Sequence, residues 1–596
     1  MRGYVFYFLN ILCLASLCVT KGHADVFESG TYYFDNSKIN YANVEFAAFD
    51  TVNNVVNVYQ LSPPAGSGGW WQLTIDEPAC CDLYSFIESD IDSGAFNEAV
   101  NDFIDNHSSR HTLMGMWHEI NPETHPHRCD YVYCPILDDA QESDGYWRTQ
   151  ESYNATASGT LPVIYIKTQG SCPVTTKDYY IDATLWIDNC GSDAFQSLGS
   201  EENPLELSIK GRGNYTWRGF YKKPYKIKFA HKLSPLGLDK SKHFVLLPHA
   251  DDLSGFLRDE TGFELSRQLG MPYTTRQLPV ELYLNDEYVG LYFLCEAIRV
   301  EDGRVDIVEQ DDYETNLFNV SGGWLLEVNG NDTRVYGMAQ NDDLSKGWFN
   351  FTSHSPENVS QAQIYYISRL ISRVDSCVFV NDKNDTGWEQ YLDIGTLTRF
   401  YIINELMSNV ESFCRSMFIY KDRGEDEKLM FGPVWDFGNS FTHAKTDDFI
   451  FNYESPFTFL WIEELLKFPR FQSSILALWK DIRDDGVLDK VIAHDWQFVN
   501  AIEVAKQFDK VRWPYYSDLW HGASAEFHNN ILLKAAWLDD QWGYDSGIST
   551  VTPNKEVKSV LYYNLQGLSS SEPFKGFNIC VTTYTDGTRH TEKVLK

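Results

Sequence analysis

The chain has 596 residues, of which 43% are hydrophobic and 15% aromatic, and its formal net charge is −35. This length exceeds what one hydrophobic core usually supports, so we expect two or more domains. The hydrophobic content excludes disorder over most of the chain, and the negative charge argues against binding to nucleic acid or anionic membranes. The acidity is compatible with divalent cations or basic protein surfaces as partners, but solubility alone is the better explanation of it.

Residues 1–24 have the features of a secretory signal peptide. Arg2 supplies a positive start, residues 4–19 are mostly apolar, and Gly22-His23-Ala24 offers a small-residue cleavage site. The apolar stretch is too short for a membrane span, and Lys21 ends it. We therefore expect a chain that is secreted or reaches the cell surface, with no transmembrane segment and no hydrophobic C-terminal anchor.

The secretory route favours glycosylation and disulfide bonds. Asn-x-Ser/Thr triplets begin at Asn106, Asn154, Asn214, Asn319, Asn331, Asn350, Asn358 and Asn384. Beyond the signal, four cysteines cluster in the N-terminal third, at Cys80, Cys81, Cys129 and Cys134. Cys172 and Cys190 form a second local pair, but sequence leaves the disulfide connectivity open.

Residues 25–155 form an N-terminal region rich in Tyr, Trp, Cys and His, and a polar, small-residue linker between 141 and 159 follows it. Its possible metal ligands are His118, Glu119, His125, His127, Cys129 and Cys134. A thiolate site needs free cysteines at a recognised spacing, and we expect these cysteines to be oxidised. The metal interpretation of this region is therefore the weaker one.

From residue 161 onward the pattern predicts strands over 161–166, 180–187, 205–209 and 224–229. A helix is predicted over 253–269, before Gly270 and Pro272. Further strands follow at 280–284, 288–294 and 323–328, the first two joined by a short turn. Helical patterns cover 459–466, 471–483, 487–508 and 523–542, and the tail has strands at 559–563 and 577–584. This order predicts an α+β fold with a β-rich first part and a helical second part.

Two acidic residues, Glu411 and Asp436, flank a predicted β-hairpin. Strands over 416–421 and 429–434 enclose the polar turn 422–427, and a helical run ends just before Glu411. An antiparallel hairpin brings its outer ends together, so the two acids are expected to approach each other.

The register of this hairpin decides how close they come. If the turn centres on Gly424–Glu425, Asp436 faces Phe413 and Glu411 faces Gly438. Opposed positions in a hairpin lie roughly 4.5–5.5 Å apart and diagonal positions about 7–8 Å. Two carboxylates at that separation can share a divalent metal.

The segment Ile209–Trp217 is predicted to be a loop between two strands, and it holds Lys210, Gly211, Arg212 and Gly213. Glycines beside basic residues suit a loop whose backbone N–H groups approach phosphate. Many Gly-x-Gly loops are plain turns, so this motif is weak by itself.

Lys226 and Lys228 alternate with apolar residues on the following strand and therefore share one face. A lysine there can reach phosphate oxygens across a cleft, and a solvated strand face explains the pattern equally well. On the helix 253–269, Glu260 and Glu264 also share a face. One of them can pair with a strand lysine, as in protein kinases, or the helix is an ordinary amphipathic one.

Taken together, several motifs resemble the CotH family, the spore-coat-type secreted atypical protein kinases. They are Ile209–Trp217, Lys222–Lys228, Val245–Pro248, Phe256–Asp259 with Leu269–Met271, Val280–Tyr292, Glu296 with Gly303–Val305, Asn404–Phe413 and Gly432–Phe437. The resemblance implies a two-lobed kinase-like fold over residues 160–545, with a β-rich N-lobe and a helical C-lobe. Residues 25–155 are then an N-terminal accessory region, and residues 550–596 a C-terminal β tail.

The resemblance also implies ATP and Mg²⁺ or Mn²⁺ as cofactors, and phosphoryl transfer to Ser or Thr of secreted, coat or cell-surface proteins. By position, the residues implied to bind nucleotide are Lys228, Lys226, Gly211, Arg212, Gly213 and Glu296. The residues implied to hold metal are Asp436, Glu411 and Asn409, and the implied catalytic residues are Glu411 and Asp436. Asn214 lies inside the glycine loop, where a glycan would block the cleft, so it is expected to be unmodified.

One position departs from the family pattern, which usually has aspartate where this chain has Glu411. Glutamate is one methylene longer, and a displacement of about 1 Å in a catalytic group can cost about 10²-fold in rate. The chain is thus predicted to be a metal-dependent kinase, with Glu411 as the position at which its activity would be weakened. The alternatives are a glycosylated adhesion protein on a pseudokinase scaffold and, least supported, a structural metal-binding coat protein.

Overall fold

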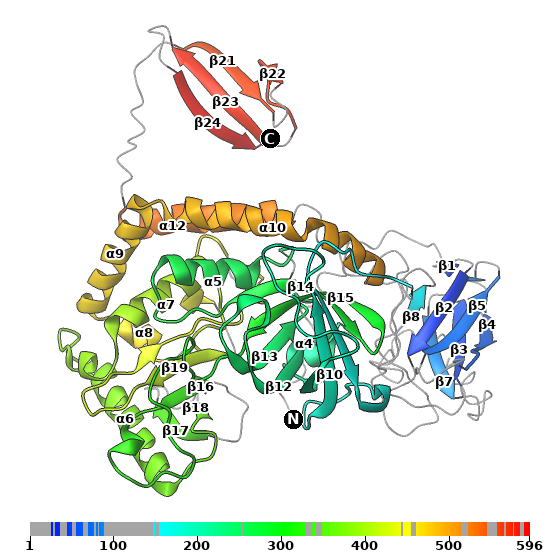
Figure 1. Cartoon of the computed structure of the whole chain (residues 1–596). Coiled ribbons are helices and arrows are strands. Elements are labelled where there is room, and N and C mark those ends of the chain that lie inside the picture. The colour runs from blue at the N-terminus through cyan, green and yellow to red at the C-terminus, as the bar shows by residue number, and fades with distance from the viewer. Residues whose placement is uncertain are drawn as a thin grey trace. The chain divides into compact units, whose positions relative to one another are not determined.

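The structure is a computed structural model. It describes residues 26–27, 30–35, 44–50, 55–63, 70–76, 79–80, 83–88, 147–149, 154–220, 222–252, 254–328, 335–340, 348–442, 445–453, 460–513, 523–544, 557–564, 568–575, 577–584 and 589–595. Helices and strands are mixed in these segments, as the predicted α+β class requires (Figure 1). The signal segment, the linker 141–145, Asn106, Asn331 and the His/Cys cluster 118–134 lie outside the described residues.

Seven strands close into a barrel in the order β10-β11-β12-β13-β15-β14-β9. They are β9 (Val163–Thr168), β10 (Ile181–Asp188), β11 (Leu205–Gly211), β12 (Tyr225–Leu233), β13 (Ser241–Leu247), β14 (Gln277–Leu284) and β15 (Glu287–Glu296). The neighbours are antiparallel except β14 and β9, whose parallel pairing closes the barrel. The sequence predicts strands at six of these places but not their closure.

The apolar side chains of the strands fill the barrel, with Ile209, Ile227 and Phe244 among the buried core. Because side chains alternate along a strand, Lys226 and Lys228 point away from this core, as predicted. A short helix, α4 (Tyr215–Gly219), follows the glycine loop between β11 and β12.

A second, five-stranded sheet has the order β17-β18-β16-β19-β20. Its strands are β16 (Trp324–Val328), β17 (Val335–Gln340), β18 (Trp348–Ser355), β19 (Met417–Lys421) and β20 (Met430–Phe431). β19 and β20 form the hairpin predicted between Glu411 and Asp436.

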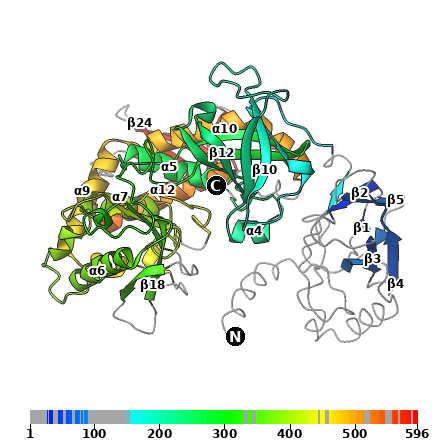
Figure 2. The ribbon, with the colours of Figure 1, turned by 60° about the horizontal axis from the view of Figure 1, so that its bottom comes forward.

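The longer helices are α5 (Arg258–Gln268), α6 (Gln361–Val378), α7 (Ile394–Leu406), α9 (Pro469–Asp484), α10 (Val487–Arg512) and α12 (Ala523–Trp542), and α8 (Ile462–Leu465) is a single turn. α5 lies beside α7 and α10 (Figures 1 and 2). It begins later than predicted because Asp252 first accepts the N–H groups of Ser254 and Arg258, at 2.7 and 3.0 Å, and so caps a turn that leads into the helix.

The described N-terminal strands form small antiparallel sheets. β2 (Gly30–Asp35) lies between β5 (Trp70–Ile75) and β8 (Trp147–Thr149). β3 (Val44–Asp50) lies between β4 (Val55–Gln60) and β7 (Leu83–Glu88), and β1 (Val26–Phe27) pairs with β6 (Ala79–Cys80).

The chain divides into two compact units, residues 1–537 and 538–596. The second unit contains a four-stranded sheet that confirms the strands predicted in the tail. Its order is β22 (Ser569–Ser570), β21 (Val557–Tyr563), β23 (Phe577–Tyr584) and β24 (Arg589–Leu595).

Cys172 and Cys190, the local pair in the sequence, are both free thiols, so no disulfide joins them. β9 and β10 are antiparallel, with Thr168 opposite Ala183 and Val163 opposite Asp188. Cys172 follows the Thr168 end of this pair and Cys190 follows Asp188, so the two thiols lie at opposite ends of two adjacent strands. A disulfide needs Cα atoms roughly 5.5 Å apart.

Among the described segments, no helix has the length and apolar character needed to cross a membrane.

Candidate functional site

Asp436 is exposed and stands in the segment that leaves β20. Its backbone is left-handed, with φ of 63°, which is uncommon for a residue with a side chain. Ser416 Oγ donates to Asp436 Oδ2 at 2.9 Å, and Asn409 Nδ2 donates to the Asp436 carbonyl at 3.2 Å. The carboxylate therefore stays accessible while its backbone is fixed.

Glu411 follows the end of α7 and lies near Asp436. Asn439 Nδ2 donates to Glu411 Oε2 at 2.7 Å, and Arg415 Nη1 lies 3.8 Å from Oε1. Burial raises the pKa of Glu411, and the negative charge of Asp436 raises it further, while Asn439 and Arg415 oppose the shift. The structure thus brings together the two acids that the sequence places on either side of the hairpin.

The predicted register of that hairpin is wrong by one residue. Ile419 pairs with Phe431 and Tyr420 with Met430, so the same register sets Glu411 against Asn439 rather than Gly438. The turn centre was placed half a residue too early, and side chains change face with each residue of slip. The bond between Asn439 and Glu411 agrees with the observed register.

Two further carboxylates, Asp251 and Asp259, accompany Asp436, and the sequence reasoning gave neither a role. Burial raises the pKa of Asp251 to about 6, and Asp436 adds to the shift. Burial also raises the pKa of Asp259 to about 6; His249 opposes this and Asp436 adds to it. The sequence feature that could have identified these two residues is the Asp251-Asp252 pair just after a strand, followed by Asp259 in the first turn of the next helix.

Gly438 keeps open a space that two of these carboxylates share. A Cβ atom at this residue would lie 3.2 Å from Asp251 Oδ2 and 3.6 Å from Asp436 Oδ1. A side chain there would fill the gap. The site thus offers carboxylate oxygens around a small space.

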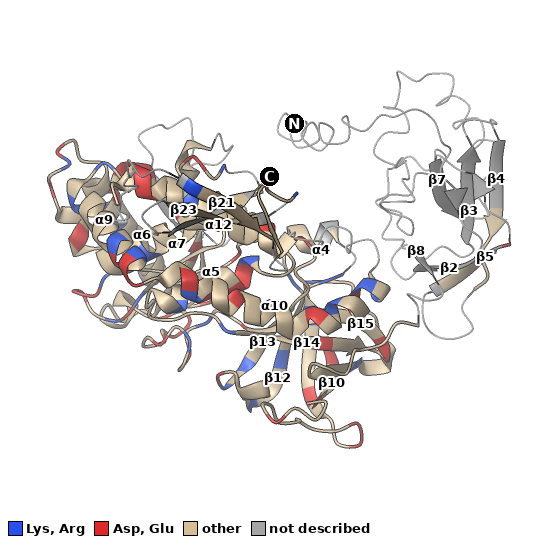
Figure 3. Cartoon of the chain, turned by 90° about the horizontal axis from the view of Figure 1, so that it is seen from above, with Lys and Arg blue, Asp and Glu red and all other residues tan. Residues whose placement is uncertain are grey.

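Two half-buried basic residues, Arg212 and Lys226, lie near each other at the barrel, and Arg212 lies near Asp436. The guanidinium of Arg212 lies 5.7 Å from the centre of the Trp435 ring; burial lowers its pKa and Asp436 counteracts this. Burial lowers the pKa of Lys226 to about 8, helped by the positive charges of Arg299, Lys210 and Arg212. Figure 3 shows basic residues along β12 and acidic residues on α5.

Lys228 lies two residues beyond Lys226 on the same face and is exposed, opposite His243 of β13. Both lysines therefore lie on the outer barrel face, and Lys226 is the half-buried one, near Arg212.

The two loop glycines have structural roles. A Cβ at Gly211 would lie 2.4 Å from the Trp217 ring, and Gly213 is left-handed with φ of 79°. Lys177 Nζ donates to the Gly213 carbonyl at 2.6 Å and to Asn214 Oδ1 at 2.8 Å. Asn214 itself is exposed.

Glu296 is fully occupied within the barrel. Its carboxylate accepts the N–H groups of Asp239 and Arg276 at 2.8 and 3.1 Å and the hydroxyl of Tyr273 at 3.1 Å. These contacts hold the end of β15, so the geometry gives Glu296 a structural role.

The suggested pairing of a helix glutamate with a strand lysine is wrong. Glu260 binds Arg267 and His494, each at 2.8 Å, and Glu264 binds Arg267 at 2.7 Å. Gln277 of β14 also donates to Glu260 Oε2 at 3.1 Å, so these partners lie on α5, on α10 and on one barrel strand, and none of them is a strand lysine.

The donor chemistry of the site suits a hard divalent ion. Asp251, Asp436 and Glu411 offer carboxylate oxygens, the ligands that Mg²⁺ and Mn²⁺ prefer, and the space beside Gly438 is reached by two of them. No group of three or more His, Cys, Asp or Glu side chains in the described part of the chain is arranged to hold a metal unaided. An ion here needs further oxygen ligands, as Mg²⁺ usually takes from water and phosphate.

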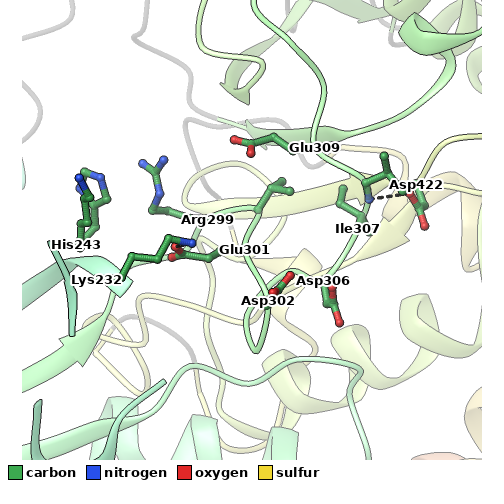
Figure 4. A pocket seen from close by; sticks show the side chains of 12 residues that line it. Lys232, His243, Arg299, Glu301, Asp302, Asp306, Ile307, Glu309 and Asp422 are labelled. Carbon is green, nitrogen blue, oxygen red and sulfur yellow. Dashed lines mark hydrogen bonds and ion pairs between the residues drawn. The ribbon is translucent and has the colours of Figure 1, made fainter. Parts of the chain in front are cut away.

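A cavity of about 710 Å³ lies beside the basic strand face (Figure 4). It is lined by Lys232, Lys242, His243, Arg299, Val300, Glu301, Asp302, Asp306, Ile307, Val308, Glu309 and Asp422. Arg299 links the cavity to the site, since its charge lowers the pKa of both Lys226 and His243, in addition to burial. The Val308 N–H donates to Asp422 Oδ1 at 2.9 Å across one wall.

The family model described as CotH kinase protein matches residues 209–538. The matched range runs from β11 to α12 and includes the glycine loop, Lys226, the four carboxylates and the cavity. No curated protein matches the chain.

Proposed function

This chain belongs to the CotH kinase protein family, whose model matches more than half of its residues, and from that membership we propose that it is a metal-dependent kinase. It transfers the γ-phosphate of ATP to Ser or Thr of extracellular, coat or cell-surface proteins. The barrel serves as the N-lobe and the helices as the C-lobe of a kinase-like arrangement. The observation that carries the proposal is the set of carboxylates around Asp436, with the half-buried Arg212 near Asp436 and Lys226 near Arg212.

Asp436 and Asp251, whose carboxylates meet beside Gly438, are the residues that would hold a divalent ion. When bound, such an ion supplies positive charge to the transferring phosphoryl group. Arg212 and Lys226 neutralise the remaining phosphate charge from the barrel side. Because little covalent chemistry is needed, this preorganised charge is the main contribution of the protein.

Glu411 is the proposed acceptor of the substrate hydroxyl proton. Its pKa is raised by burial and by Asp436, which brings it closer to the working pH and makes it a stronger base. Asn439 holds one of its oxygens at 2.7 Å, which orients the carboxylate.

The nucleoside of ATP is proposed to occupy the cavity lined by Arg299 and Val308. The cavity volume of about 710 Å³ lies in the usual range for small-ligand sites. The charge link through Arg299 to Lys226 supports a path for the phosphates from the cavity to the carboxylates.

The test is transfer of radiolabelled phosphate by the purified full chain with Mg²⁺ or Mn²⁺. Asp436→Ala is expected to abolish transfer, because it removes an exposed carboxylate from the centre of the site. Glu503→Ala, an exposed acid on α10, is the matched control and should leave the rate unchanged. Equal transfer by both variants would contradict the proposal.

A second candidate function is a non-catalytic adhesion protein on a pseudokinase scaffold. It is supported by Glu411, which stands where the family usually has aspartate. It is also supported by Gly211 and Gly213, because packing and backbone conformation explain both glycines without a bound nucleotide. Nucleotide binding without transfer, with transfer restored by Glu411→Asp, would identify a degenerate kinase. If Glu411 is functional, Glu411→Asp is expected to change the rate by up to about 10²-fold, since it moves the carboxylate by over 1 Å. Absence of nucleotide binding would favour adhesion.

A further inference from the structure

The first turns of α5 hold the chain directly after Asp436. The Phe437 N–H donates to Asp259 Oδ1 at 2.8 Å, and Arg258 Nη1 donates to the Gly438 carbonyl. The Phe437 ring packs so closely on Gly262 that a Cβ there would lie 2.2 Å from it. Three residues of one helix thus contact the two residues that follow Asp436.

One peptide group is fixed at both of its polar atoms. Asn409 Nδ2 donates to the Asp436 carbonyl at 3.2 Å, and Asp259 accepts the N–H of the next residue, Phe437. Together they set the orientation of the peptide between Asp436 and Phe437. This matters because Asp436 has a left-handed backbone, a conformation uncommon for residues other than glycine, which its surroundings must hold in place.

The opposite side of α5 is tied to two other helices. Thr261 Oγ1 donates to Asp495 Oδ2 of α10 at 2.7 Å, and His528 of α12 shares the same oxygen at 3.0 Å. Glu260 binds His494 of α10 at 2.8 Å. Because α5 is anchored in this way, Asp259 offers its oxygen to Phe437 from a fixed position.

We propose that Asp259 is a positioning residue for Asp436. It acts as a hydrogen-bond acceptor for the Phe437 N–H and thereby aims the Asp436 carboxylate, without itself binding a cation. The proposal rests on the proposed function, in which Asp436 holds a divalent ion. Beyond that function, it states that positioning of Asp436 requires a hydrogen-bond acceptor oxygen at residue 259 and does not require a negative charge there.

Two substitutions separate these roles, because asparagine keeps the acceptor oxygen and alanine removes it. Mn²⁺ is titrated into the full chain while the free ion is followed by electron paramagnetic resonance, and kcat and KM for ATP are measured in parallel. Asp259→Asn should retain Mn²⁺ affinity within about threefold. Asp259→Ala should lose about 10–100-fold, the usual cost of removing a group that orients a metal ligand.

Asn409→Ala removes the other anchor of the same peptide and should reproduce the loss, which keeps the proposal testable if Asp259→Ala does not fold. Glu264→Ala is the matched control on α5, since its carboxylate contacts Arg267 and Gln268. Thermal unfolding without metal establishes that each variant is folded.

A loss for Asp259→Asn as large as that for Asp259→Ala would overturn the proposal, because the charge would then be the active feature. Unchanged Mn²⁺ affinity in Asp259→Ala, with binding abolished by Asp436→Ala, would also overturn it while leaving the proposed function intact. Unchanged Mn²⁺ affinity in Asp436→Ala would reject the proposed function itself.

Discussion

Lys226 is a residue of the proposed phosphate site whose charge changes with pH near neutrality. Its pKa is lowered to about 8 by burial and by neighbouring cations. Below that value the side chain is protonated and attracts phosphate; as pH rises through about 8, the free chain loses this charge. The affinity for ATP is therefore expected to fall between pH 7 and pH 9.

The measurement is calorimetric titration of ATP into the full chain at both pH values. Lys226→Arg should flatten the dependence, because arginine stays charged throughout this range. Lys228→Met is the matched control on the same strand face and should keep the fall. A fall that persists in Lys226→Arg would show that another group titrates.

At this scale the sequence predicted part of the site. Glu411 and Asp436 could be found because a hairpin joins them. Asp251 and Asp259 could not, because the approach of both to Asp436 depends on how the barrel, α5 and the β19–β20 hairpin pack. For Glu296 the motif predicted a nucleotide-binding role that the contacts do not favour. Two backbone N–H groups and a tyrosine hydroxyl already bind its carboxylate, and the sequence does not reveal these contacts.

At the scale of elements, local patterns identified six of the seven barrel strands and most of the long helices, while α6, many of the other strands and one register were missed. The run Ile364–Ile367 in α6 favours a strand by its residue types. The helix forms because its buried residues, Ile367, Leu370, Ile371, Val374 and Val378, recur every three or four positions and because Ser360 and Gln363 make a capping box. The closure of the barrel depends on a pairing between distant strands, which no local pattern encodes.

One buried ion pair ties α7 to α12. Lys534 Nζ lies 2.7 Å from Glu405 Oε1, and both side chains are fully buried. Lys534→Met leaves the glutamate charge buried without its partner, so it should cost about 3–5 kcal/mol of stability. Lys480→Met, which breaks the exposed pair with Asp484, should cost less than about 1 kcal/mol.

Thermal unfolding of the two variants beside the unmodified chain provides the comparison. A Lys534→Met variant with the same unfolding midpoint as Lys480→Met would mean that the buried pair contributes nothing to the joint between these helices.

At the scale of the whole molecule, the proposed site lies within the family-matched range 209–538, and residues 538–596 form a compact unit of their own. A chain ending at residue 544 keeps all of α12 and every residue assigned to the site. It is expected to keep transfer of labelled phosphate within about threefold of the full chain, because every residue assigned to the site belongs to the other unit. Loss of transfer in a folded, truncated chain would give the tail a part in catalysis.

The barrel closes when β9, one of its earliest strands, pairs with β14, more than a hundred residues later. During translation, a nascent polypeptide that has not yet delivered Gln277–Leu284 to the outside of the ribosome carries β9 with one hydrogen-bonding edge unpaired. Such an edge invites pairing with other chains, and long-range contacts of this kind form slowly. Synthesis of this protein thus includes an interval in which chaperones have a defined target.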